Sequence, residues 1–196
     1  MPLSLLNRRI LNFGLARSYD YHGVIKCREW CTIDNGMARV NQLLDYDEYI
    51  CSMEKIERLE KERHFCKHGF EHSLNVARIA YAYILEKGER ILPKEVVYAA
   101  AFLHDIGRWI EYETGEDHAE ASARLARPML NECGFSTEDS QVILLGIREH
   151  RNHQADNLTL LGEALTLADD WSRDCRHCTA QTLCYKFSVE MKQIMY

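Results

Sequence analysis

The apolar residues of this chain recur at intervals of three and four positions from residue 37 almost to its end. Such spacing gathers them on one face of an α-helix. From Val40 to Leu59 a charged face separates the apolar positions, and the pattern predicts one long amphipathic helix. No stretch with a period of two rivals these segments, so the predicted fold class is all-α. The further predicted helices cover residues 70–87, 93–103, 117–134, 136–150, 158–171 and 184–195.

Several predicted helix starts carry residues that favour such positions. Pro93 fits a first turn, where its missing N–H group has no helical partner to lose. Asp117 and Glu120 have the spacing of a capping box, and Ser136 or Thr137 can cap the helix that follows. We therefore expect these three helices to begin close to the positions named.

The predicted helix KEVVYAAAFL, at residues 94–103, is apolar on almost all sides and belongs in the centre of the core. His104 and Asp105 follow it directly, and a buried charge is tolerated when it is paired or coordinates a metal. His72 lies 32 residues before His104, and Asp169 lies 64 residues after Asp105. Packing of four helices would bring these side chains to one point, as in the metal sites of helical bundles. The competing interpretations are a hydrogen-bonded polar cluster without metal, and Asp170 in place of Asp169.

Composition and charge narrow the class of protein. The chain has 196 residues, of which 46% are apolar and 28% charged, as in one folded domain with appendages. Lys and Arg total 24 against 30 Asp and Glu, and the net charge of −6 argues against an extended nucleic-acid-binding surface. No apolar run approaches the length of a membrane span. We therefore expect a soluble, cytoplasmic protein with no membrane partner.

Eight cysteines and nine histidines point to metal chemistry. Arg8 and Arg9 interrupt the apolar residues near the start, where a secretory signal needs an unbroken run. The cysteines are therefore interpreted as thiols rather than disulfides. The first 36 residues are interpreted as an N-terminal extension, and we place no chemistry on their His22, Cys27 and Cys31.

The set His72, His104–Asp105 and Asp169, within HSLNVARIA, AAAFLHDIG and ALTLADD, resembles the HD-domain superfamily of metal-dependent phosphohydrolases. The resemblance covers about residues 63–173, and the string from MARVNQLL through FCKH to the late cysteines is similar to a bacterial subgroup. It implies an HD-domain helical bundle over residues 37–174, with a cysteine-containing segment, 175–196, packed on the same domain. It also implies a divalent metal held by the H, HD and D residues. One departure is Arg108, which stands where the family frequently has Lys after HDIG.

His118 and His150 extend the resemblance to the two-metal members of the superfamily. In that scheme His72, His104, Asp105 and Asp169 hold one ion, and Asp105 bridges to a second ion held by His118 and His150. His153 competes with His150 for this role. Imidazole and carboxylate ligands favour Mn, Fe, Co, Ni or Zn, so the expected cofactor is one or two such divalent ions.

The resemblance implies hydrolysis of a phosphoester by a metal-activated hydroxide, either as a phosphomonoesterase or as a phosphodiesterase. The expected substrate is a nucleotide or another small phosphorylated metabolite. Asp105, Arg108 and Glu71 are the predicted catalytic residues, and Glu71 and Glu149 are expected to orient water or the adjacent histidines. The guanidinium fork matches phosphoryl oxygens, and the candidate substrate-binding residues are Arg108, Arg148 and Arg151.

Two other functions use the same residues. The six-ligand order also occurs in di-iron oxygenases of the superfamily, which consume oxygen and release no phosphate. A non-catalytic metal or nucleotide sensor would bind its ligand without turnover. Both remain alternatives to the phosphohydrolase.

A second constellation lies near the C-terminus, where Cys175, Cys178 and Cys184 have the spacing C-x2-C-x5-C. A tetrahedral zinc ion needs a fourth ligand, which Cys66 or His68 in the FCKH segment could supply. The candidates are a structural zinc ion or an iron–sulfur cluster, and the alternative is a set of free thiols.

Overall fold

The computed structural model describes residues 36–88, 92–152 and 156–196. The predicted extension at residues 1–36, apart from Gly36, lies outside this part of the chain, as does His153. The described residues belong to one packed unit, to which the following description refers.

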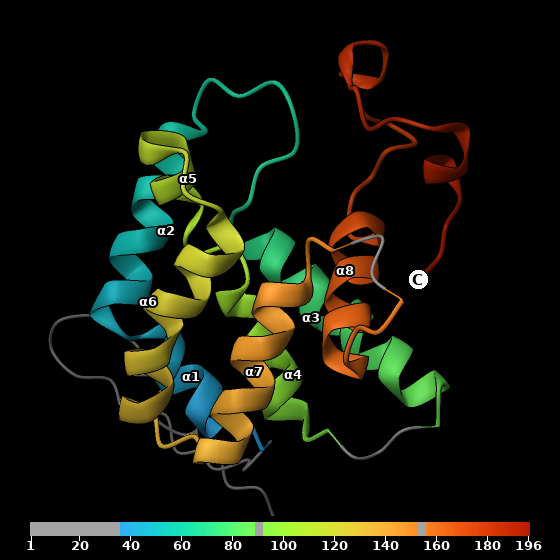
Figure 1. Cartoon of the computed structure of the whole chain (residues 1–196). Coiled ribbons are helices and arrows are strands. Elements are labelled where there is room, and N and C mark those ends of the chain that lie inside the picture. Colours follow the sequence, from blue (N-terminus) through green and yellow to red (C-terminus); the bar gives the residue numbers. More distant parts are fainter. Residues whose placement is uncertain (1–35, 89–91, 153–155) are drawn as a thin grey trace, which may run out of the picture. The chain divides into compact units, whose positions relative to one another are not determined.

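The described residues form α-helices joined by short loops, with two 3-10 turns near the C-terminus and no strand (Figure 1), which confirms the predicted all-α class. None of these helices is both long and apolar enough to cross a membrane. In chain order the elements are α1 (Ala38–Leu44), α2 (Asp47–Leu59), α3 (Phe70–Glu86), α4 (Lys94–Leu103), α5 (Arg108–Thr114), α6 (His118–Glu132), α7 (Thr137–Glu149), α8 (Leu160–Trp171), η1 (Gln181–Leu183) and η2 (Val189–Lys192).

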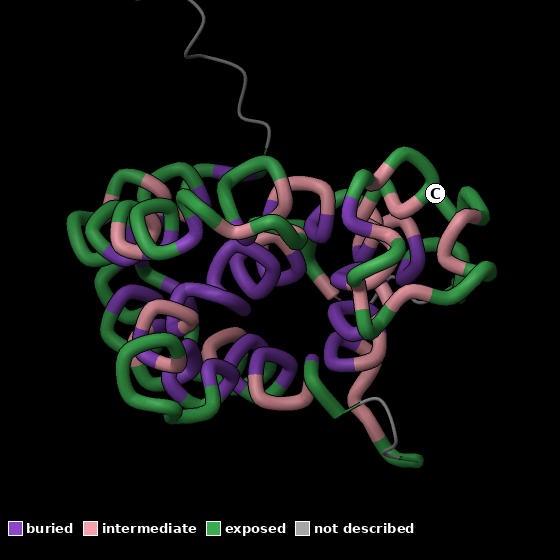
Figure 2. The backbone as a smooth tube through the Cα atoms, turned by 90° about the horizontal axis from the view of Figure 1, so that it is seen from above, coloured by how far each residue is buried: buried purple, intermediate pink, exposed green. Residues whose placement is uncertain are grey.

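Helix α4 lies at the centre of the core, as its apolar sequence predicts. It packs against α1, α3, α6 and α7. Its residues from Ala99 to Leu103 are all buried, and Figure 2 shows buried backbone on the inner sides of the surrounding helices. Burying a side chain such as Leu103 contributes about 1.5–3 kcal/mol to stability.

The turn after α4 is fixed by a close approach between two backbones. Gly107 donates its N–H to the hydroxyl of Ser122 on α6 at 2.8 Å. A Cβ atom at Gly107 would lie 2.4 Å from the backbone nitrogen of Ser122 and 2.7 Å from the Cβ of Ala121. The glycine of HDIG therefore lets the turn that carries His104 and Asp105 press against α6.

The caps predicted at Asp117 and Ser136 are present, but the Glu120 carboxylate of the predicted capping box pairs with Arg148 instead. The Asp117 carboxylate accepts the backbone N–H groups of Ala119 and Glu120 at the start of α6. The Ser136 hydroxyl accepts the N–H of Asp139 at the start of α7. These bonds satisfy N–H groups that have no partner within the helix.

The single helix predicted from Val40 to Leu59 is wrong, because the structure divides it into α1 and α2. Tyr46, between the two, has an extended backbone. The break lets α1 pack against α4 while α2 packs against α5. The two halves share one apolar periodicity, so the sequence pattern does not reveal the break.

The α-helix predicted from Cys184 to Met195 is also wrong, because within it only η2 is helical, as a short 3-10 turn, and the rest of the backbone is irregular. Tyr185, Val189 and Ile194 are 88%, 73% and 84% exposed, so no apolar face meets the core. Helical stability in proteins comes chiefly from packing such a face, and this segment lacks that support.

Candidate metal centre

The six ligand candidates from the sequence converge at one buried point. They come from the start of α3, the turn after α4, the start of α6, the end of α7 and the last turns of α8. Their ligand atoms form two groups, and within each group all atoms lie within 4.8 Å of one another. The first group is His72, His104, Asp105 and Asp169, and the second is Asp105, His118 and His150.

Asp105 belongs to both groups, and its two carboxylate oxygens face different histidines. Its Oδ2 lies 3.2 Å from His104 Nε2 and 3.6 Å from His72 Nε2. Its Oδ1 lies 3.2 Å from His118 Nε2 and 3.8 Å from His150 Nε2. One carboxylate is therefore shared between two sets of nitrogen donors.

All four histidines present the same ring nitrogen to Asp105. In each ring an oxygen atom close to Nδ1 can accept its proton, which leaves the Nε2 lone pair free for a metal. The pairs are His72 with the Ser172 hydroxyl at 3.1 Å, His104 with the Ala101 carbonyl at 2.6 Å, His118 with the Glu111 carboxylate at 2.7 Å and His150 with the Ile147 carbonyl at 2.6 Å.

The centre contains buried polar atoms that form ion pairs but make no aligned hydrogen bond. His72 Nε2, His104 Nε2 and both oxygens of Asp105 are buried without a hydrogen-bond partner among the described residues. Leaving such an atom unsatisfied costs about 1–3 kcal/mol. A cation would satisfy these atoms together, and imidazole and carboxylate donors suit divalent transition metals. The residues present therefore fit a metal ion.

The protonation states of Asp105 and His150 favour a cation, whereas His72 holds a proton that a cation would have to displace. Burial opposes ionisation of Asp105, but His104 and Arg108 outweigh it and hold the pKa of Asp105 well below its usual range. Burial together with the neighbouring His104 lowers the pKa of His150 to about 3, so its ring is neutral. Burial would lower the pKa of His72, but Asp105 and Asp169 raise it to about 9. A cation bound between these carboxylates would compete with the His72 proton.

Three residues that support the cluster were not predicted from the sequence. Arg173 places Nη2 2.7 Å from both carboxylate oxygens of Asp169. Ser172 donates to the Asp169 carbonyl at 2.9 Å, so its oxygen can accept from His72. These two follow Asp169 by three and four residues, a helical spacing that could have indicated them. Glu111, beside His118, comes from α5 and had no comparable signal.

The three predicted arginines lie in different surroundings. Arg108 is largely buried, with Nε 3.0 Å from Asp105 Oδ1. Arg151 pairs with Glu111 and Asp117, at 3.1 and 2.6 Å, and so supports the partner of a cluster histidine. Arg148 pairs with the exposed Glu120 at 3.0 Å and makes no contact of this kind with the cluster. The structure therefore brings Arg108 to the centre and leaves Arg148 out of it.

The two predicted glutamates also differ. Glu71 is exposed and lines a cavity next to His72. Glu149 bonds to Thr159 instead. Its carboxylate accepts the backbone N–H of Thr159 at 3.0 Å and the Thr159 hydroxyl at 2.5 Å. It thereby ties the end of α7 to the start of α8. Both bonds use Oε2 of Glu149, and no contact between this carboxylate and the cluster histidines is seen among the described residues, so its role in orienting water or a histidine stays a prediction.

A cavity of about 420 Å³ opens beside the centre, with His72 in its wall. Cations, an amide and two carboxylates line it, which suits a polar ligand. The residues relevant here are Lys67, Glu71, His72, Asn75 and Arg173.

The cysteines predicted as a second constellation gather near this cavity. Cys66, Cys175 and Cys178 line it. Burial raises the pKa of the Cys175 thiol, and Cys66, Cys178 and Cys184 raise it further, so all four thiols are electrostatic neighbours. Among the described residues only the two His–Asp groups bring three or more ligand atoms within 4.8 Å, so the sulfur atoms are more widely spaced.

His68 does not join the cysteines through its Nδ1 atom. The ring is buried, and Nδ1 pairs with the Glu60 carboxylate at 2.5 Å. The backbone N–H of His68 donates to the same carboxylate at 2.7 Å. Of the two fourth ligands left open by the sequence, the structure favours Cys66.

The segment that carries all six cluster residues is similar to known proteins. The profile of the HD domain matches residues 69–174. An uncharacterized protein of Clostridium beijerinckii is 36% identical over 148 residues, which cover 76% of this chain and 92% of the relative. The crystal structure of a predicted HD superfamily hydrolase from an uncultured Thermotogales bacterium is similar with a TM-score of 0.50 and 25% identity, over 67% of this chain and 72% of that chain.

Proposed function

The chain belongs to the HD-domain family, and from that premise we propose that it is a metal-dependent phosphohydrolase acting on a nucleotide or another small phosphorylated metabolite. The observation that carries the proposal is the position of Asp105, whose two oxygens face separate histidine pairs. A shared carboxylate of this kind suits a two-metal site for displacement at phosphorus.

In the proposed site His72, His104, Asp105 and Asp169 hold one divalent ion. Asp105, His118 and His150 hold the second. The nitrogen donors favour Mn, Fe, Co, Ni or Zn. When bound, such a pair supplies an activated water molecule and neutralises charge on a phosphoryl group.

The surrounding residues keep the ligands in place. The oxygen acceptors at the four Nδ1 atoms hold the imidazole rings with Nε2 turned toward Asp105. Arg173 holds the Asp169 carboxylate through both of its oxygens. Because the chain supplies these contacts itself, the ligand geometry is fixed before any substrate arrives.

Arg108 and Glu71 are the residues proposed to act on the substrate. Arg108 keeps a permanent positive charge beside Asp105, where it can neutralise a phosphoryl oxygen. Glu71 lies in the cavity wall next to His72, where it can orient water. The cavity volume of about 420 Å³ lies within the range of small-molecule sites and favours a metabolite over a macromolecular substrate.

The test is a phosphate-release assay on protein that was purified without oxygen and analysed for metal. Metal-loaded wild type should release phosphate from a panel of nucleotides and sugar phosphates or cleave an aryl phosphodiester, and Asp105→Ala should not. Oxygen consumption without phosphate release would instead identify an oxygenase. Nucleotide binding without turnover would identify a sensor, and either result would overturn the proposal.

A further inference from the structure

We propose that Cys66, Cys175, Cys178 and Cys184 bind one structural zinc ion that is separate from the His–Asp centre. Zinc is commonly held by four thiolates in tetrahedral structural sites, and C-x2-C is a usual spacing for two of them. Cys66 precedes α3, and the other three follow α8. Such an ion would join two segments that are more than 100 residues apart in the chain.

The first support is the position of the thiols. Cys66, Cys175 and Cys178 line one cavity, and Cys184 is an electrostatic neighbour of Cys175. All four are partly exposed thiols and none is in a disulfide. No three of their sulfur atoms lie within 4.8 Å of one another, so a zinc ion held by all four requires a local rearrangement of this segment.

The second support is that the cysteine segment has almost no core of its own. From Asp170 to Tyr196, Ala180 is the only buried residue. Segments of this length rarely fold alone without a disulfide, a metal or a partner surface. Binding of zinc to these thiols would contribute its free energy directly to the order of this segment.

Local hydrogen bonds already bend the segment so that its cysteines can meet. The Gln181 side-chain amide donates to the carbonyls of Cys175 and Arg176 at 2.6 and 2.9 Å. Cys184 donates its backbone N–H to the Gln181 carbonyl at 3.3 Å. Gln181 therefore connects the loop of the first two cysteines to the third.

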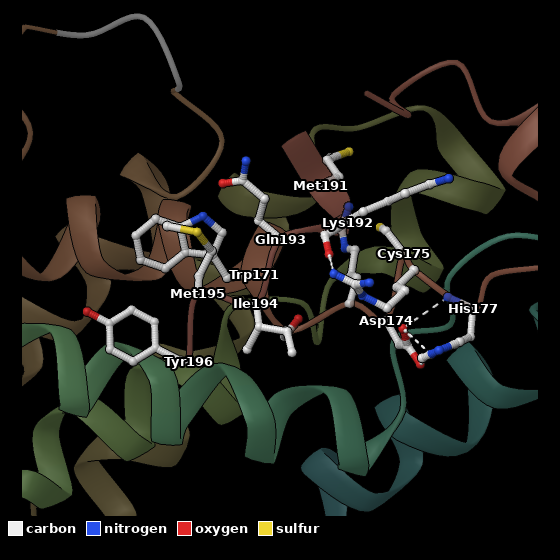
Figure 3. A pocket seen from close by; sticks show the side chains of 13 residues that line it. Trp171, Asp174, Cys175, His177, Met191, Lys192, Gln193, Ile194, Met195 and Tyr196 are labelled. Atoms are coloured by element: carbon white, nitrogen blue, oxygen red, sulfur yellow. Dashed lines mark hydrogen bonds and ion pairs between the residues drawn. The ribbon is translucent and has the colours of Figure 1, made fainter. Parts of the chain in front are cut away.

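The last residues of the C-terminal segment, 191–196, are held separately from the cysteines, around a second cavity of about 330 Å³ (Figure 3). The Tyr196 ring stacks on Trp171, with ring centroids 5.4 Å apart, and its hydroxyl donates to Glu86 at 2.6 Å. Arg176 donates to the Lys192 carbonyl at 2.8 Å. Cys175 lies at the far end of this cavity from Tyr196. These contacts hold the last residues but do not connect them to Cys66.

The proposed ion would also help to position two residues that contact the His–Asp centre. Ser172 and Arg173, which contact His72 and Asp169, lie three and two residues before Cys175. The guanidinium of Arg173 lies close enough to Cys66 for their charges to interact, so it can offset the negative charge of a zinc–thiolate site. Each thiol releases a proton when it binds zinc, and binding should therefore weaken as the pH falls.

The experiment replaces zinc with cobalt in the full chain. Protein stripped by a chelator under reducing conditions is titrated with Co²⁺, and its absorption is recorded. We expect the sulfur-to-cobalt charge-transfer band and the visible bands of tetrahedral cobalt. Histidine and carboxylate ligands give no sulfur band, so the result is independent of whether the His–Asp centre hydrolyses phosphoesters.

Three variants assign the ligands. Cys178→Ser and Cys66→Ser should each weaken the sulfur band and lose one zinc per chain in native mass spectrometry. Cys51→Ser is the matched control, because Cys51 is exposed on α2, and it should keep both signals. Circular dichroism checks that each variant is helical.

Two results would overturn the proposal. Absence of the sulfur band in wild type would exclude a thiolate site, even if a variant failed to fold. An undiminished band in Cys66→Ser would exclude the four-cysteine site that joins the two segments.

Discussion

The His–Asp centre and the cysteine segment are both groups of metal-ligand residues, but the fold supports them very differently. The centre is built on helices and the turns at their ends, and each histidine is held through Nδ1 by a residue of the surrounding structure. The cysteines of the C-terminal segment lie on irregular backbone with one buried residue nearby. Helix packing therefore places the ligands of the first site, whereas we expect order in the second to depend on the ion.

Asp105→Ala should have the largest effect on the His–Asp centre. This change removes the carboxylate shared by both ligand groups, so we expect loss of both ions and of hydrolysis, with a helical chain retained. Metal analysis and the phosphate-release assay measure the effect. Asp170→Asn is the control, because Asp170 neighbours a proposed ligand without belonging to either group. Wild-type activity in Asp105→Ala would refute the proposed centre.

His118→Ala and His150→Ala distinguish the two ligand groups of the centre, because each affects only one of them. Each removes a proposed metal ligand that lies beside Oδ1 of Asp105. The number of bound ions should therefore fall from about two to one per chain. His72→Ala should instead weaken the other ion. Native mass spectrometry counts the ions. A wild-type chain that saturates at one ion outside the cysteines would contradict the two-metal site.

Gly107→Ala tests how tightly the turn after α4 is packed. The added methyl group would collide with the backbone of α6, so we expect the free energy of unfolding to fall by about 1–3 kcal/mol. Chemical denaturation measures the change. Gly69→Ala is the matched control, since nothing lies within 4 Å of a Cβ there and its φ is −82°. Equal effects of the two substitutions would show that the close approach is not tight.

The free energy of unfolding of metal-free protein should change with pH by an amount similar to the effect of Gly107→Ala. The pKa of His72 is raised from 6.5 to about 9 by Asp105 and Asp169 against the effect of burial. Because folding raises this pKa, the protonated His72 ring stabilises the folded state fully below pH 6.5. This contribution is lost as the pH rises toward 9. Chelated protein should lose roughly 1–3 kcal/mol of unfolding free energy across this window. His72→Gln should flatten the profile, and an unchanged slope would contradict the assignment.

Arg148→Ala should have the smallest effect. Its guanidinium pairs with Glu120 on an exposed surface, and such pairs contribute about 0–1 kcal/mol. We expect kcat and KM close to those of wild type, whereas Arg108→Ala should lower kcat/KM strongly. A comparable loss in both variants would restore Arg148 as a substrate-binding residue.

The sequence predicted the parts of the molecule that depend on local pattern. The apolar run before His104–Asp105 identified both the central helix and the buried polar pair, and Asp117 marked the start of α6. Glu111 was not predicted, because its contact with His118 arises only when α5 packs against α6. The helix predicted at 184–195 failed because its apolar residues have no core surface to meet.

Anomalous diffraction from crystals soaked in Mn²⁺ tests the shared role of Asp105 most directly. The account predicts two peaks about 3.5–4 Å apart, one bound to Oδ2 of Asp105 with His72 and His104, and one bound to Oδ1 with His118 and His150. A single peak, or both oxygens of Asp105 on one ion, would contradict it.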